Sequence, residues 1–144
     1  GPDVVGHNIE TVKRIFSAVR PQADYQRSLN VLRSVRQEGF PDIVVKSGFM
    51  VGLGETDQEV EELMRDLSDA GCDLLTIGQY LAPSGGQRHV PVQRFVEPAQ
   101  FERYRRQGME MGFRHVFSAP LVRSSYLAHE AYQACWNPAV EGES

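Results

Sequence analysis

Four residues in the stretch GFMVGLGE have the types and spacing of a site that brings a ligand against the backbone. Gly48, Met50, Gly52 and Glu55 form a GxMxGxxE pattern where an apolar run gives way to a polar one. Glycine lets a ligand approach the main chain closely, and a helix that starts just afterwards offers free N–H groups to negative charge. A tight turn with a helix cap explains the same pattern, so these residues alone leave both interpretations open.

A second group, HNIET, contains an amide and a carboxylate two residues apart. Asn8 and Glu10 follow a short apolar segment. At the end of a strand such groups can hydrogen-bond to the paired hydroxyls of a ribose. The structural alternative is that Asn8 caps a helix whose apolar face runs from Ile9 to Phe16, with acids in its first turn. The sequence is compatible with both.

The third group, PLVRSSY, places an arginine beside two serines. Ser124 and Ser125 stand where they could cap a following helix, because a serine oxygen accepts free N–H groups at a helix start. Arg123 adds a planar fork of donors that suits a carboxylate or a phosphate. The histidines outside HNIET have no i, i+4 partner of a ligating type, so they indicate no metal site.

These groups need a scaffold that brings them together, and the chain alternates strand and helix patterns. Apolar periodicity and caps predict helices from Asn8 to about Phe16, over residues 25–37, 56–70 and 98–111, and in a last segment after RSSY that reaches about residue 136. Apolar runs predict buried strands within residues 44–51, 72–83 and 114–119, and residues 3–6 have the pattern of the last residues of a strand. Thr56 and Glu59 form a capping box for the third of these helices, and Gly112 is a stop for the fourth.

Strands and helices that alternate with short links are typical of parallel βαβ units. About three such units fit in this chain, which is too few for a closed barrel, and the first strand starts abruptly. The sequence therefore predicts an α/β fold that is a partial (β/α) barrel and a fragment of a larger domain. We expect residues 1–136 to belong to that domain and residues 137–144 to form a disordered tail. The long polar loop 84–98 suggests a functional or mobile segment.

Composition and charge indicate which kinds of partner and which cellular compartment are expected for this chain. The formal net charge of the 144 residues is -4, which argues against a nucleic-acid surface, because such surfaces need a basic excess. No apolar run approaches the roughly 18 residues of a membrane-spanning helix, and no signal-peptide pattern opens the chain. We expect a cytosolic protein, or a mitochondrial one in a eukaryote. Cys72 and Cys135 lie far apart, outside any close-spaced metal or redox motif.

Five segments occur in the same order as in a known family and cover nearly the whole chain: PDVVGHNIETV, VRPQADYQRSL, KSGFMVGLGET, LTIGQYLAPS and PLVRSSYLA. Together they closely resemble the carboxyl-terminal half of the lipoyl synthase family of radical S-adenosylmethionine enzymes. The resemblance implies a partial (β/α) barrel with a carboxyl-terminal extension that carries RSSY. It also implies that the GxMxGxxE pattern is the family's fifth-strand GxIxGxxE, which lies against the adenosyl portion of the cofactor.

The resemblance implies cofactors, substrate and residue roles as well. Family members insert two sulfur atoms into an octanoyl chain carried by a lipoyl-carrier protein domain, using S-adenosylmethionine and two [4Fe-4S] clusters. The residues implied to contact S-adenosylmethionine are Asn8, Glu10, Gly52 and Glu55. Ser125 would ligate the auxiliary cluster, and Arg123 would steady the serine oxygen or orient the substrate.

The chain departs from the family pattern in its cysteines. The family holds its clusters with a CxxxCxxC run and a separate cysteine trio, and neither is present here. We therefore expect that the chain alone neither holds the radical-generating cluster nor turns over, and that the amino-terminal half of the barrel must be supplied to it. Two alternatives remain: a biotin-synthase-like sulfur-inserting enzyme, which RSSY disfavours, and a non-catalytic module that binds an acyl carrier domain.

Overall fold

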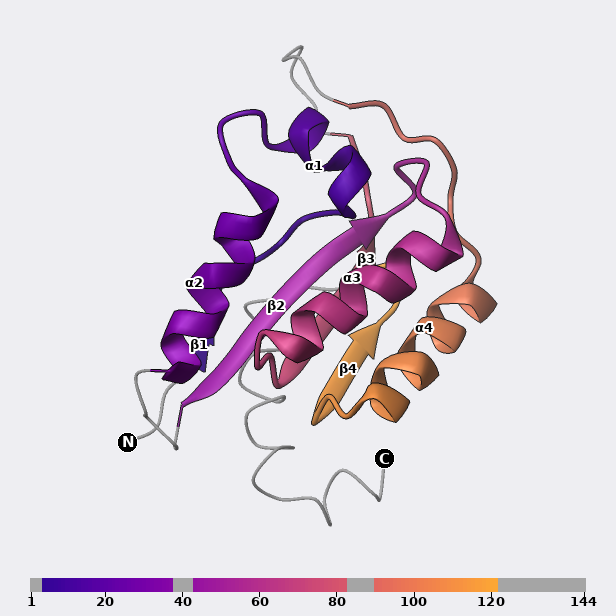
Figure 1. Ribbon diagram of the computed structural model, residues 1–144. Coiled ribbons are helices and arrows are strands. Elements are labelled where there is room, and N and C mark those ends of the chain that lie inside the picture. The colour runs from indigo at the N-terminus through magenta and orange to yellow at the C-terminus, as the bar shows by residue number, and fades with distance from the viewer. Residues whose placement is uncertain (1–3, 38–42, 83–89, 122–144) are drawn as a thin grey trace.

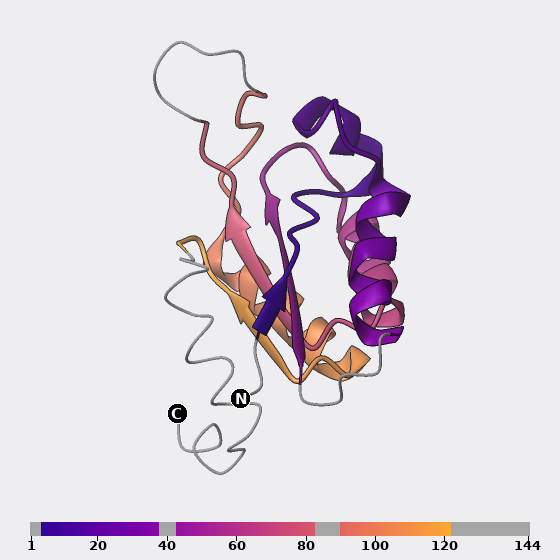
Figure 2. The ribbon, with the colours of Figure 1, turned by 90° about the vertical axis from the view of Figure 1, so that its left-hand side faces the viewer.

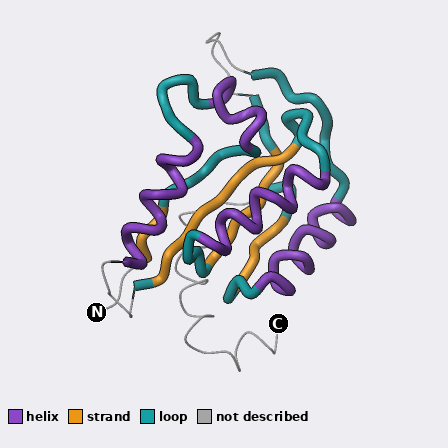
Figure 3. The backbone as a smooth tube through the Cα atoms, viewed as in Figure 1, coloured by secondary structure: helices purple, strands orange, loops and turns teal. Residues whose placement is uncertain are grey.

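The computed structural model describes residues 4–37, 43–82 and 90–121. Its elements, in chain order, are β1 (Val4–Gly6), α1 (Lys13–Val19), α2 (Tyr25–Gln37), β2 (Val44–Val51), α3 (Asp57–Asp69), β3 (Leu74–Gln79), α4 (Pro98–Met111) and β4 (His115–Ser118). The four strands form one parallel sheet in the order β1-β2-β3-β4, as Figures 1 and 3 show. Each strand is therefore joined to its neighbour by a crossover that contains at least one helix.

The helices pack on one face of the sheet (Figure 2). Strand residues that point toward the helices are almost fully buried, among them Val45, Phe49 and Ile77. They pack in a single core with the apolar side of α3, which presents Leu63 and Leu67. Because side chains alternate along a strand, the intervening residues of the same strands must point to the opposite face.

That opposite face changes character along the strands. Near the amino-terminal ends it carries a small apolar cluster in which Val44 and Leu74 are buried and Val4 and Phe117 pack against them. Toward the carboxyl-terminal ends it carries glycine and polar residues, because Gly48 is in register with Thr76 and Met50 with Gly78. The face without helices thus ends in a region where the backbone is accessible.

The sheet is not closed. Within the described residues, β1 pairs only with β2, and β4 pairs only with β3. This confirms the predicted α/β class and agrees with a partial barrel. Across residues 4–37, 43–82 and 90–121, every helix is too short or too polar to cross a membrane.

Local sequence signals account for boundaries of three helices, α2, α3 and α4. In α3, Thr56 accepts a hydrogen bond from the Glu59 N–H at 3.1 Å, and the Glu59 carboxylate accepts one from the Thr56 N–H at 2.9 Å, which confirms the capping box. In α4, Pro98 occupies the first turn, and Gly112 ends the helix with φ 105°. Helix α2 spans the 25–37 range that its apolar spacing predicts.

The prediction for the first helix is wrong at its start. Helix α1 begins at Lys13, and its N-cap is Val12, which makes no side-chain capping bond. Asn8 therefore does not cap this helix. The backbone from His7 to Glu10 is instead hydrogen-bonded to β2.

Candidate functional site

The HNIET segment continues along β2 after β1 ends. The His7 N–H donates to the Lys46 carbonyl at 3.1 Å. The N–H groups of Ile9 and Glu10 then both donate to the carbonyl of Gly48, at 3.1 and 3.2 Å. Two successive donors on one acceptor produce a local bulge, and bulges re-aim the side chains next to them. This bulge explains why the segment does not enter a helix directly.

Glu10 adopts an unusual backbone conformation in this bulge. Its φ is 76°, which makes it the one non-glycine residue with positive φ in the described ranges. Its N–H is bound to Gly48, and its carbonyl accepts from the Met50 N–H at 2.9 Å, so β2 holds it on both sides. A non-glycine residue in the left-handed region costs about 1–3 kcal/mol, and such residues cluster at functional sites.

A pocket of about 240 Å³ lies beside this bulge, on the face of the sheet that carries no helix. It is lined by residues from the carboxyl ends of the strands and the segments that follow them: Asn8, Glu10, Gly48, Phe49, Met50, Thr76, Gly78, Gln79, Leu81, Pro120 and Leu121. The carboxyl ends of parallel strands are where α/β folds bind their ligands. The pocket brings Asn8 and Glu10 together with Gly48 and Met50 of the GxMxGxxE pattern.

The lining of the pocket is divided between polar and apolar groups. Asn8, Glu10 and Thr76 supply an amide, a carboxylate and a hydroxyl. Leu81 and Leu121 supply large apolar side chains that are 53% and 80% exposed. A ligand that presents hydroxyls on one side and an apolar surface on the other matches this division.

Gly48 keeps the polar part of the pocket open. A Cβ atom at this position would lie 2.2 Å from the Thr76 hydroxyl oxygen and 3.3 Å from the Asn8 amide oxygen. The first of these distances is far below van der Waals contact, so glycine is required by the side chains that converge here. The same geometry shows that Asn8, after β1, and Thr76, in β3, approach the same point from opposite sides of β2.

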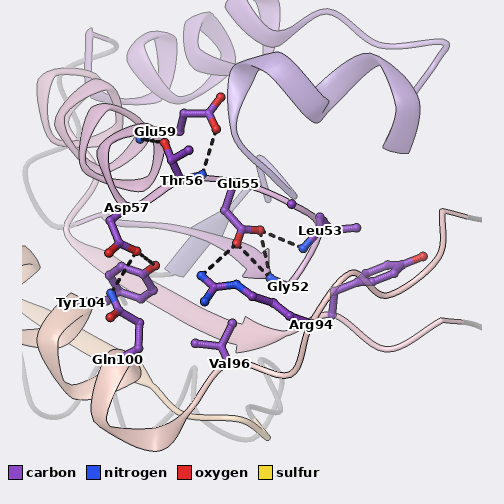
Figure 4. Close-up of polar contacts among 12 residues, drawn as sticks. Gly52, Leu53, Glu55, Thr56, Asp57, Glu59, Arg94, Val96, Gln100 and Tyr104 are labelled. Carbon is purple, nitrogen blue, oxygen red and sulfur yellow. Dashed lines mark hydrogen bonds and ion pairs between the residues drawn. The ribbon is translucent and has the colours of Figure 1, made fainter.

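The other half of the pattern forms a rigid turn at the end of β2. Glu55 has a side chain with 0% exposure. One of its carboxylate oxygens accepts from the N–H groups of Gly52 and Leu53, each at 2.9 Å (Figure 4). The Arg94 guanidinium lies 3.8 Å from the other oxygen. The carboxylate is therefore engaged with its own turn and does not line the pocket.

Segment 90–97 is attached to this turn and to β3. Gly52, which has φ 100°, accepts through its carbonyl from the N–H groups of Gln93 at 2.8 Å and Arg94 at 3.3 Å. The Gln79 side chain accepts from the Val96 N–H at 2.8 Å and donates to the Arg94 carbonyl at 2.9 Å. The described part of the long loop is thus fixed to the ends of both central strands.

Three ionisable groups of the sheet and its flanking segments have pKa values shifted mainly by burial. Burial lowers the pKa of His7, and the nearby Arg20 lowers it further while Glu10 opposes the shift. Burial also lowers the pKa of Lys46, which points to the same face of β2 as Gly48. The thiol of Cys72 is buried and donates to the Leu74 carbonyl at 3.0 Å, and burial raises its pKa to about 12. A thiol held in this way is a poor metal ligand.

The predicted site residues have different places in this structure. Asn8 and Glu10 line the pocket, whereas Gly52 and Glu55 form the supporting turn. Their assignment as cofactor contacts stays a prediction. Arg123 and Ser125 lie outside the described residues, and so does the expected tail over 137–144. Within the described part of the chain, no three His, Cys, Asp or Glu side chains are grouped so that they could hold a metal ion.

Two side chains at the site were not predicted from the sequence. Thr76 lines the polar part of the pocket, and Gln79 joins β3 to segment 90–97. Both belong to the apolar run LLTIGQ. The signal that could have found them is the presence of a hydroxyl and an amide in a strand that is otherwise buried, since buried polar groups require partners.

Comparison with known proteins gives two findings. The model of the radical SAM superfamily matches residues 1–67, which include the HNIET segment and the GxMxGxxE turn. Over 127 residues the chain is 58% identical to a protein named lipoyl synthase from Caldanaerobacter subterraneus subsp. tengcongensis, a match that covers 88% of this chain and 44% of that protein.

Similar relatives come from other bacteria. The chain is 57% identical over 129 residues to a lipoyl synthase from Rubrobacter xylanophilus, covering 90% of this chain and 39% of that protein. It is 54% identical over 142 residues to a lipoyl synthase from Geobacter sp. strain M21, covering 99% of this chain and 47% of that protein. The chain spans less than half the length of each of these relatives.

Proposed function

Because this chain belongs to the lipoyl synthase family within the radical SAM superfamily, we propose that it forms part of the S-adenosylmethionine site of a lipoyl synthase. The observation that carries the proposal is the pocket in which Asn8 and Glu10 meet the backbone of Gly48 and Met50. The nucleoside portion of S-adenosylmethionine occupies this pocket. Its ribose hydroxyls face the Asn8 amide and the Glu10 carboxylate.

The residues present fit a nucleoside for three physical reasons. An amide and a carboxylate are good partners for the two hydroxyls of a ribose. The absence of a side chain at Gly48 leaves room against the backbone of β2. The apolar side chains of Met50 and Leu81 line the same pocket and offer a surface for the flat face of a base.

Glu55 and Gln79 support the site from behind. Glu55 fixes the turn at Gly52 and Leu53, and Gln79 fixes segment 90–97 against β3. These are positioning roles, because the Glu55 carboxylate bonds to the backbone of its own turn and the Gln79 amide bonds to the backbone of Arg94 and Val96. Preorganised supports of this kind keep a binding site within its productive geometry.

An iron–sulfur cluster together with S-adenosylmethionine supplies the radical chemistry of this superfamily. The ligands for such clusters are cysteine thiolates, and in the described part of this chain the one cysteine, Cys72, is a buried thiol of raised pKa. We propose that the cysteines of the radical-generating cluster come from the part of the protein that this chain does not span. Ser125, which we predict to ligate an auxiliary cluster, and Arg123, which we predict to orient the substrate, complete the chain's contribution.

The proposed reaction is the one that the relatives' names indicate, which is the formation of a lipoyl group. It proceeds by insertion of two sulfur atoms into an octanoyl chain. The proposed partners are an octanoylated lipoyl-carrier domain as substrate and the remaining part of the barrel. The relatives reported above all carry the name lipoyl synthase. We therefore do not carry forward the alternative of a biotin-synthase-like enzyme.

The test is equilibrium binding of S-adenosylmethionine to the full-length protein that contains this chain, measured by isothermal titration calorimetry. In Glu10→Gln the side chain keeps its size but loses its charge. Loss of a charge-assisted hydrogen bond of about 1.5–3 kcal/mol raises the dissociation constant about tenfold to a hundredfold.

Glu62→Gln is the matched control, because Glu62 is an exposed carboxylate on α3, in the helix layer away from the pocket. Its dissociation constant should equal that of the wild type. If Glu10→Gln bound S-adenosylmethionine with wild-type affinity, the HNIET segment would have a purely structural role. A wild-type protein that does not bind S-adenosylmethionine would refute the proposed function.

A further inference from the structure

The hydroxyl of Thr76 is a polar group that the proposed function leaves unused. Thr76 lies on β3, in register with Gly48, on the face without helices. The residue is 7% exposed, and it lines the pocket. Its remaining exposure is therefore directed into the pocket.

This hydroxyl has no hydrogen-bonding partner among the residues that the structure describes, although its strand backbone is fully paired between β2 and β4. Its oxygen is not among the fully enclosed polar atoms that lack a partner in the described residues, so it is open to the pocket. A hydroxyl that faces a pocket and has no protein partner is free to hydrogen-bond to a ligand. A valine has a similar shape and a high strand propensity but could not make that bond.

Gly48 leaves the space in front of this hydroxyl open. A Cβ atom at Gly48 would stand 2.2 Å from the Thr76 oxygen, far inside contact distance, so the glycine leaves the space beside the hydroxyl free of a side chain. The Asn8 amide oxygen reaches the same point, 3.3 Å from that Cβ position. Asn8 and Thr76 therefore face one portion of the pocket's occupant.

We propose that Thr76 is a further binding residue of the nucleoside site, whose hydroxyl hydrogen-bonds to the same portion of the bound nucleoside as Asn8. The inference rests on the proposed function, because it takes the occupant to be the nucleoside of S-adenosylmethionine. It adds a contact from β3 to those from the segment after β1. The nucleoside is then held from two strands that flank the glycine.

The experiment compares Thr76→Val with Thr76→Ser in the full-length protein. The probes are S-adenosylmethionine and 5′-methylthioadenosine, which shares the nucleoside but lacks the amino acid. Thr76→Val removes one neutral hydrogen bond and should weaken the binding of both probes by the same factor, about three- to tenfold. Thr76→Ser keeps the hydroxyl and should stay within about twofold of wild type.

Thermal melting without ligand separates a binding role from a structural one. Because the hydroxyl has no partner in the described chain, Thr76→Val should melt at the wild-type temperature or above it. Ser47→Ala is the matched control, since Ser47 is a fully buried hydroxyl of β2 on the helix-facing side, also without a partner in the described chain. It should change neither affinity.

Several results would overturn the inference. The contact with the nucleoside would be refuted if Thr76→Val bound both probes with wild-type affinity. It would also be refuted if Thr76→Ser lost as much affinity as Thr76→Val, or if Thr76→Val lost affinity for S-adenosylmethionine but not for 5′-methylthioadenosine. A lowered melting temperature in Thr76→Val would show that the hydroxyl stabilises the fold. If Glu10→Gln weakens binding and Thr76→Val does not, the inference alone fails. If the wild type binds neither probe, the proposed function fails with it.

Discussion

The strained backbone at Glu10 allows a test in which glycine should be more stable than alanine. Glu10→Ala and Glu10→Gly both remove the carboxylate, so both should weaken the binding of S-adenosylmethionine. They differ in the backbone, because φ is 76° at this position and β2 holds the residue through the Gly48 carbonyl and the Met50 N–H. Alanine must keep the left-handed conformation, whereas glycine adopts it without steric cost.

The magnitude follows from two opposing effects. The left-handed conformation costs a residue with a side chain about 1–2 kcal/mol. Glycine avoids this cost but loses more conformational freedom on folding, which offsets about 0.5–1 kcal/mol. Glu10→Gly should therefore be more stable than Glu10→Ala by about 0.5–1 kcal/mol. At an ordinary helical position the order is reversed, and glycine is about 1 kcal/mol less stable than alanine.

Glu62, an exposed residue within α3, provides that ordinary position. The assay is urea denaturation of the full-length variants followed by circular dichroism, with the two Glu62 variants measured in parallel. The expected result is opposite signs for the glycine–alanine difference at the two positions. If glycine destabilises position 10 as much as position 62, Glu10 is not strained and the bulge is not as described.

Three further predictions concern the supports of the site. Gly48→Ala should destabilise the protein by about 1–3 kcal/mol in urea denaturation, because its Cβ would lie 2.2 Å from the Thr76 oxygen; an unchanged midpoint would contradict this. Glu55→Gln replaces one acceptor of a fully buried carboxylate with a donor and should cost about 1–3 kcal/mol. An unchanged stability in Glu55→Gln would mean that the turn does not depend on the carboxylate. Arg14 holds the pKa of Glu59 at about 2, mainly through a direct hydrogen bond. Since this folded-state pKa lies below the unfolded value, the pair stabilises the protein above about pH 4.3 and the stabilisation is lost as pH falls toward 2. Arg14→Ala should flatten the dependence of stability on pH in that window, and an unchanged dependence would contradict the pairing.

Local signals were sufficient to predict most of the elements. Helix α2, the capping box of α3 and the proline and glycine that bound α4 are encoded by residues close to one another in sequence. The start of α1 was predicted wrongly because it depends on β2. Asn8 has the type and position of a helix cap, but the N–H groups that follow it are taken by the Gly48 carbonyl, which lies forty residues away.

The site was predictable only in part, for a similar reason. Asn8 and Glu10 were identified from their chemistry and the ends of strands, and the structure brings them to one pocket. Glu55 was grouped with them, but its carboxylate is used within its own turn, which spacing does not reveal. Thr76 depends on the register between β2 and β3, and register is a property of the sheet that a single strand does not specify.

The measurement that tests the central claim most directly is a crystal structure of the full-length protein with S-adenosylmethionine bound. The account predicts that the ribose lies within hydrogen-bonding distance of the Asn8 and Glu10 side chains, at about 2.6–3.2 Å. It also predicts that the Glu55 carboxylate still accepts from the Gly52 N–H. A nucleoside bound away from the Gly48 backbone, or out of reach of Asn8 and Glu10, would contradict the account.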